Sequence, residues 1–98
     1  MKLSTAQIRF LRSHAHKLKP VVMVGANGVT ENLLLELEIA LNSHELIKVK
    51  VRAEEREDRD AMIEAICKAS GAFNVQRIGH IITLFRRNPD KPKYTLPK

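Results

Sequence analysis

A strand–turn–helix pattern near residue 25 constrains the fold of this chain more than any other feature. The apolar run VVMV, residues 21–24, ends at Gly25, and Gly28 follows three positions later. Two of the four glycines therefore fall in one turn. Thr30 occupies an N-cap position ahead of a leucine-rich segment, residues 31–43. The pattern predicts a buried β-strand that turns directly into a helix with an apolar stripe.

Caps and alternation mark two further elements. Ser4 and Gln7 form the capping-box pattern of a helix start, so we expect a leading helix over residues 5–16. The segment 46–52 reads LIKVKVR, and its apolar and basic residues alternate. Successive side chains of a strand point to opposite faces. We therefore expect a half-buried strand with one basic, open face.

The second half of the chain is expected to add a helix and a hairpin. A cap at Asp58 or Asp60 would begin this third helix, and Gly71 would end it. Two strands, residues 74–78 and 81–86, flank a Gly-His pair that is typical of a tight hairpin turn.

The resulting order α-β-α-β-α-β-β predicts one α/β domain over residues 1–98. Two β-α-β units and a hairpin make an open sandwich with a mixed four-stranded sheet, and helices must cover at least one face. Residues 88–98 hold three of the four prolines and are expected to form a basic, extended tail.

The charge distribution favours a polyanionic partner. The formal net charge is +6, and residues 1–30 contain five Lys or Arg and no acid. A surplus of charge that serves only solubility is the alternative. Aromatic residues make up only 4% of the chain, which argues against a stacking surface for unpaired bases.

The cysteine count and the absence of long apolar runs indicate where the protein is located. A single cysteine excludes an internal disulfide and a multi-cysteine zinc site, and it fits a reducing compartment. The chain lacks the apolar segment of a secretory signal and a run long enough to span a membrane. We expect a cytoplasmic protein, with a monomer as the default state.

The turn between Gly25 and Gly28 has the character of an anion site. Glycine permits positive φ and close approach of another backbone, and the first amides of a helix carry partial positive charge. The Walker loop and the dinucleotide fingerprint are both absent. A G-x-x-G turn is also the clamp by which KH domains hold a nucleic-acid strand. On this motif alone, a tight strand-to-helix connection is an equal alternative.

Catalytic and metal-binding sets are not indicated. His14 and His16 lie two apart on a helix and diverge, so they cannot share a metal. Cys67 is expected to be a buried, inert thiol. The carboxylates of residues 54–60 alternate with arginines as in a solvated loop. We therefore expect no enzyme, no cofactor, no metal and no small-molecule substrate.

Three segments together resemble a known family: LRSHAHKLKPVVMVGANGVTENLLLELEIAL, HELIKVKV and GAFNVQRIGHIITLFR. They are similar to the CRM domain, the chloroplast RNA splicing and ribosome maturation module, in its single-domain bacterial form, the YhbY family. The resemblance extends from Leu3 to about Leu96. It implies a fold similar to the C-terminal domain of translation initiation factor three, with an extra leading helix. It also implies binding to ribosomal RNA in precursors of the large ribosomal subunit, and hence a ribosome-associated assembly role.

The resemblance implies RNA contacts at the G-x-x-G turn and at the basic residues around it. Some relatives have a lysine inside the turn, where this chain has Ala26 and Asn27, so backbone amides are expected to make the contact. Lys48 and Lys50 have an equal alternative as a solvent-facing strand surface. The expected RNA-binding residues are Gly25, Ala26, Asn27, Gly28, Arg9, Arg12, His16, Lys17, Lys19, Lys48, Lys50, Arg86 and Arg87.

Other function classes remain as alternatives. A protein-interaction module would dock the second helix or the tail on a partner. A small RNA-processing enzyme would need clustered acid–base groups or metal-binding carboxylates, and the sequence offers no convincing set. Binding to duplex DNA would need a recognition helix, which the sequence does not indicate.

Overall fold

The computed structural model describes residues 2–25 and 27–97, and within them three helices and four strands follow the expected order. The elements are α1 (Thr5–Ala15), β1 (Pro20–Val24), α2 (Glu31–His44), β2 (Leu46–Val51), α3 (Arg56–Ser70), β3 (Phe73–Ile78) and β4 (Ile81–Phe85). The expected α/β class is confirmed.

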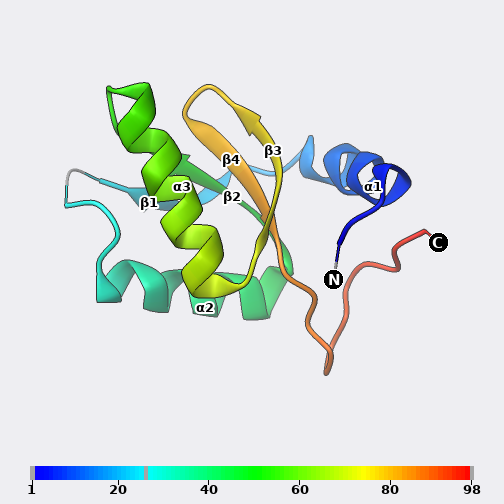
Figure 1. Ribbon diagram of the computed structural model, residues 1–98. Coiled ribbons are helices and arrows are strands. Elements are labelled where there is room, and N and C mark those ends of the chain that lie inside the picture. Colours follow the sequence, from blue (N-terminus) through cyan, green and yellow to red (C-terminus); the bar gives the residue numbers. More distant parts are fainter. Residues whose placement is uncertain (1, 26, 98) are drawn as a thin grey trace.

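The four strands form one mixed sheet in the order β1-β2-β4-β3 (Figure 1). β1 and β2 are parallel, whereas β4 runs antiparallel to both β2 and β3. α2 therefore connects two adjacent parallel strands. α3 connects β2 to β3, which are parallel to each other with β4 between them. Both β-α-β units that the sequence predicts are present.

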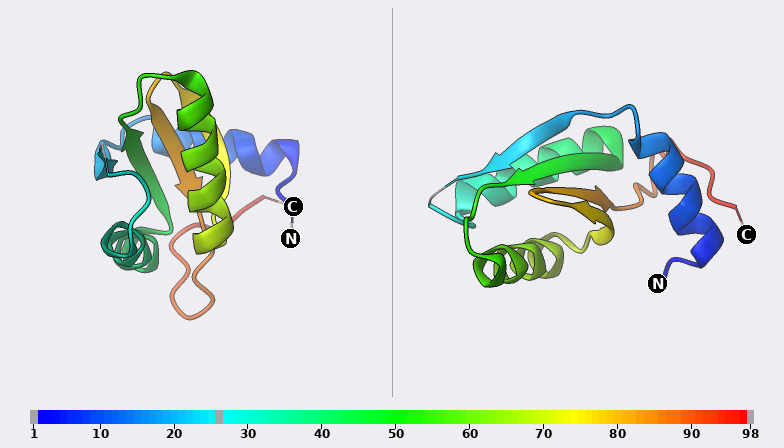
Figure 2. Two further views of the ribbon diagram at one scale, coloured as in Figure 1. Left: turned by 60° about the vertical axis from the view of Figure 1, so that its left-hand side comes forward. Right: turned by 90° about the horizontal axis from the view of Figure 1, so that it is seen from above.

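The two faces of the sheet are covered unequally (Figure 2). α2 and α3 pack on one face, where Ile47, Val49 and Val51 of β2 join the main core. α1 packs against the other face at one end only, where its residues Leu11 and Ala15 meet a small second core. The second core also contains Leu46, Val75 and Phe85. The rest of this second face stays open, as the alternation of residues 46–52 predicts.

Helix α3 begins earlier than its cap signals indicate. Its N-cap is Glu55, which makes no side-chain capping hydrogen bond, so the expected caps at Asp58 and Asp60 are wrong. Asp60 lies inside the helix and pairs with Arg77 of β3. Gly71 does end the helix, with a left-handed φ of 73°.

The C-terminal tail is extended and attached to the body of the protein at Glu45. This residue is 1% exposed, and its carboxylate accepts hydrogen bonds from the backbone amides of Asn88 (2.6 Å), Tyr94 (3.1 Å) and Lys93. Tyr94 and Leu96 pack against the second core and fix the tail to the body of the protein. No helix of the described residues is long and apolar enough to cross a membrane.

Candidate nucleic-acid interface

The two glycines of the turn have different structural roles. Gly28 has a φ of 72°, a conformation that other residues adopt only with strain, and its amide donates to the carbonyl of Gly25 at 3.0 Å. Ala26 lies outside the described residues. Gly28 is therefore required by the backbone path of the turn itself.

Gly25 is not required by the fold. Its φ is not positive, and a Cβ built on it would meet no atom within 4 Å. Neither backbone strain nor internal packing explains a glycine at this position. Glycine does leave the backbone open to close approach from outside. The geometry thus leaves room for a ligand where β1 ends.

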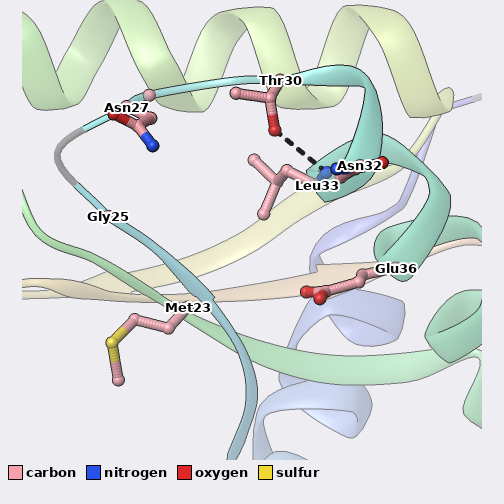
Figure 3. A pocket seen from close by; sticks show the side chains of 8 residues that line it. Met23, Gly25, Asn27, Thr30, Asn32, Leu33 and Glu36 are labelled. Atoms are coloured by element: carbon pink, nitrogen blue, oxygen red, sulfur yellow. Dashed lines mark hydrogen bonds between the residues drawn. The ribbon is translucent and has the colours of Figure 1, made fainter.

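A hollow of about 260 Å³ lies between the end of β1 and the start of α2 (Figure 3). Thr30 caps α2 by accepting from the amide of Leu33 at 3.2 Å, so that amide is already occupied. The amides of Glu31 and Asn32 belong to the first helical turn, where intrahelical partners are lacking. Fewer backbone amides are therefore available to bind an anion than the sequence alone predicts, because the amide of Leu33 is already bonded to Thr30.

The hollow itself is not basic. Its lining residues are Met23, Gly25, Asn27, Gly28, Thr30, Asn32, Leu33 and Glu36, and Glu36 is their only charged member among the described residues. Glu31 adds a second carboxylate in the first turn of α2. Any positive charge for an anion must therefore come from the neighbouring sheet face rather than from α2.

The open face of the sheet supplies this charge next to the turn. The strand register places Met23, Lys50, Ile81 and Ile78 in one row across β1, β2, β4 and β3. Lys48 stands one row nearer to α1. Just beyond β2, Arg52 Nη1 lies 3.8 Å from the Met23 sulfur.

The other expected basic residues lie farther away. Arg9 and Arg12 are exposed on α1 and His16 directly after it, at the opposite end of the molecule from the turn (Figure 1). Lys17 and Lys19 are exposed on the link from α1 to β1. The open face lies between these groups and the turn, so they form a discontinuous basic surface rather than one cluster.

Arg86 is engaged within the protein. Its guanidinium donates to both carboxylate oxygens of Glu38, at 2.5 and 3.0 Å, and to Asn42 and the carbonyl of Ser70, both at 2.9 Å. The hydrogen bonding of Arg86 to Glu38 holds the pKa of that carboxyl below its usual value. Arg86 therefore joins β4 to α2 and α3, whereas Arg87 beside it is exposed.

His14 and Cys67, two further described residues that could carry chemistry, pack against other side chains. The rings of Phe10 and Tyr94 lie 4.4 and 5.4 Å from that of His14. Cys67 is half-buried rather than buried as expected, and this partial burial raises its pKa. Within residues 2–25 and 27–97, no group of three or more His, Cys, Asp or Glu is placed to hold a metal ion.

Sequence reasoning missed two residues near the open face. His80, in the turn between β3 and β4, lines a second hollow beside Lys50 and Arg52. Arg59 of α3 reaches the same region and contacts the His80 ring. No local pattern brings residues 50–54, 59 and 80 together, because their proximity depends on how the hairpin meets β2.

Comparisons with known proteins agree with this architecture. The sequence model of the CRS1/YhbY (CRM) domain matches residues 3–86. An RNA-binding protein of Haemophilus influenzae is 51% identical over 96 residues, covering 98% of this chain and 96% of the relative. A probable RNA-binding protein of Pseudomonas aeruginosa is 47% identical over 96 residues, covering 98% of this chain and 91% of the relative.

A solved structure has the same fold. The solution structure of a hypothetical protein from Staphylococcus aureus superimposes with a TM-score of 0.83 at 32% identity, covering 98% of this chain and all of the other. Together with the family match, this shows that the chain belongs to the CRS1/YhbY (CRM) domain family, as its motifs indicate.

Proposed function

We propose that this protein binds RNA without catalysing a reaction, and that its partner is ribosomal RNA in precursors of the large ribosomal subunit. The names of its relatives support RNA as the partner. The proposal that this RNA is ribosomal rests on the family resemblance. The expected cytoplasmic, ribosome-associated location and the monomeric state belong to the same proposal.

One observation carries the RNA-binding proposal: Gly25 leaves open backbone at the edge of a hollow, next to a basic sheet face. A nucleic-acid backbone needs both close approach and positive charge. The turn and the first amides of α2 provide the first, and Lys48 and Lys50 provide the second. Basic residues of α1, the β1 link and Arg87 add attraction that does not depend on sequence.

The turn is tested by adding charge where the fold has room. Gly25→Asp places a carboxylate in open space without requiring a positive φ, so the fold should stay intact. We expect RNA affinity, measured by fluorescence anisotropy, to fall about tenfold, which corresponds to about 1.4 kcal/mol.

The matched control is Ala65→Asp, which adds the same charge at an exposed position of α3, on the covered face of the sheet. It should change affinity less than twofold. Equal losses in the two variants, or none in either, would show that the turn does not contact RNA. Incubation of the labelled RNA with pure protein and Mg²⁺ should leave it uncleaved.

Sedimentation of cell lysate through a sucrose gradient tests the ribosomal part. The protein should migrate with large-subunit particles at low salt and return to the top of the gradient after RNase digestion. A protein that stays at the top without RNase would contradict the ribosomal role, while direct RNA binding would still be judged by the anisotropy assay.

A further inference from the structure

A second hollow, of about 460 Å³, lies where β2 ends against the hairpin turn. It is lined by Lys50, Arg52, Ala53, Glu54 and His80. Two of these side chains are cations, one is an imidazole, and one is an acid. Neither of the two ion pairs found in the described residues involves Lys50 or Arg52, and Glu54 is the one carboxylate among the lining residues.

Hydrogen bonds hold the walls of this hollow in place. The amide of Val51 donates to the carbonyl of His80 at 2.7 Å, and the His80 Nδ1 lies 3.3 Å from the carbonyl of Val51. Arg59 Nη1 donates to the carbonyls of Ala53 (3.0 Å) and Glu54 (3.3 Å). The loop after β2 and the hairpin turn are thus joined before any ligand binds.

Arg59 also adds positive charge behind the hollow. Its Nη1 lies 3.4 and 3.5 Å from the two ring nitrogens of His80, so the guanidinium lies against the imidazole. Its Nε is buried and has no hydrogen-bond partner among the described residues. A site whose walls carry Lys50, Arg52 and His80, with Arg59 behind them, suits an anion with several oxygen acceptors.

The second hollow adjoins the first. Met23 lines the hollow at the turn, and its sulfur contacts Arg52, which lines the second hollow. Met23 and Lys50 are also partners in the β1–β2 register. A linear polyanion held at residues 25–28 can therefore continue over Met23 to Lys50 and Arg52.

We propose that the second hollow binds a backbone phosphate of the same RNA strand that the turn holds. This inference rests on the proposed function and identifies its ligand as a strand that spans two neighbouring sites. Continuity between the hollows favours a phosphodiester chain over an isolated carboxylate or a free phosphate.

Charge-removing variants test the second site. The probe is a fluorescein-labelled single-stranded 12-nucleotide oligouridylate, titrated with the full chain at several salt concentrations. The double variant Lys50→Gln/Arg52→Gln should bind at least about fivefold more weakly. Its log–log salt slope should be shallower by about 0.7 for each lost phosphate contact. The control Lys68→Gln removes one exposed cation from α3 and should change affinity less than twofold.

The outcomes separate this inference from the proposed function. If the double variant matches Lys68→Gln in affinity and slope while Gly25→Asp still loses affinity, the second site is refuted and RNA binding stands. If the wild-type chain binds no RNA, both proposals fail. Loss of affinity with unchanged salt slope would also overturn the phosphate assignment.

Two further probes distinguish the source of the anion. In NMR spectra of ¹⁵N-labelled protein, the oligouridylate should shift the His80 signals at micromolar concentration, whereas inorganic phosphate should not. A shift with inorganic phosphate alone would point to a free-phosphate site and overturn the proposal. Equal competition by a polyglutamate of the same length would overturn it in favour of an acidic peptide.

Discussion

Glu45 combines a strained backbone with a buried carboxylate, and its replacement by glycine separates the two effects. Its φ of 63° is the one positive value at a non-glycine residue within the described chain. Its carboxylate accepts three backbone amides of the tail. Glycine would relieve the strain and remove the three hydrogen bonds at once.

The expected effect follows from these opposing terms. A non-glycine residue held in a sparsely populated backbone region, as Glu45 is with a φ of 63° and a ψ of −46°, costs about 1–3 kcal/mol. Each hydrogen bond to a charged group contributes about 1.5–3 kcal/mol. The released tail amides would be hydrated, so the lower figure applies to each bond. Glu45→Gly should therefore lower the free energy of unfolding by about 1.5–3.5 kcal/mol, although it removes a strained residue.

Urea titration followed by circular dichroism measures this free energy. Tyr94 is the only tyrosine of a chain without tryptophan, so its fluorescence reports on the tail alone. In native Glu45→Gly, the Tyr94 side chain should become more accessible, so that acrylamide quenches its fluorescence more strongly. Glu45→Gln, which keeps the strain and part of the hydrogen bonding, should also be less stable than wild type. A Glu45→Gly protein more stable than wild type, with a protected Tyr94, would refute this reasoning.

Three further predictions concern separate parts of the fold. Because Arg86 lowers the pKa of Glu38, their pairing stabilises the protein above the unfolded pKa near 4.5 and is lost as pH falls through the lowered folded value. Glu38→Gln should thus lower the free energy of unfolding by up to about 1 kcal/mol at pH 7, a small loss because Glu38 is nearly half exposed. The difference from wild type should shrink between pH 5 and pH 2. A difference in urea titrations that does not depend on pH would contradict this. Cys67, whose pKa is raised by burial, should react slowly with Ellman's reagent at pH 7 and rapidly in urea, and equal rates would contradict its burial. Gly71→Ala should lower the free energy of unfolding by about 1–2 kcal/mol in thermal unfolding, because the φ of Gly71 is 73°. An added Cβ meets no other atom, so backbone strain is the cause, and an unchanged stability would contradict it.

Features set by local sequence were predicted well. The capping box at Ser4 and Gln7 forms, with hydrogen bonds of 2.9 and 3.1 Å. The alternation of residues 46–52 places Lys48 and Lys50 on the open face. These patterns depend on neighbours within four residues, so the sequence displays them directly.

Features set by tertiary contacts were not predicted. Asp60 has the residue type of a helix cap, but it pairs with Arg77 across the fold. From the sequence, Arg86 is predicted to be a cation free to bind RNA. In the structure it is bound by Glu38, which lies 48 positions away along the chain. His80 lines the second hollow, with Arg59 against its ring, only because the hairpin meets the end of β2. The roles of the turn residues in RNA binding stay predictions.

The position of α1 and the tail at one end of the sheet has a consequence for how the domain can be joined to other chains. Gln7 donates to the carbonyl of Pro97 at 3.0 Å, so the two described ends of the chain lie side by side (Figure 2). The end of β1 and the start of α2, which flank the turn, lie at the far end of the molecule (Figure 1). A fused tag, a surface-immobilisation linker or a second copy of the domain attached at either end would therefore leave the open face and the turn accessible.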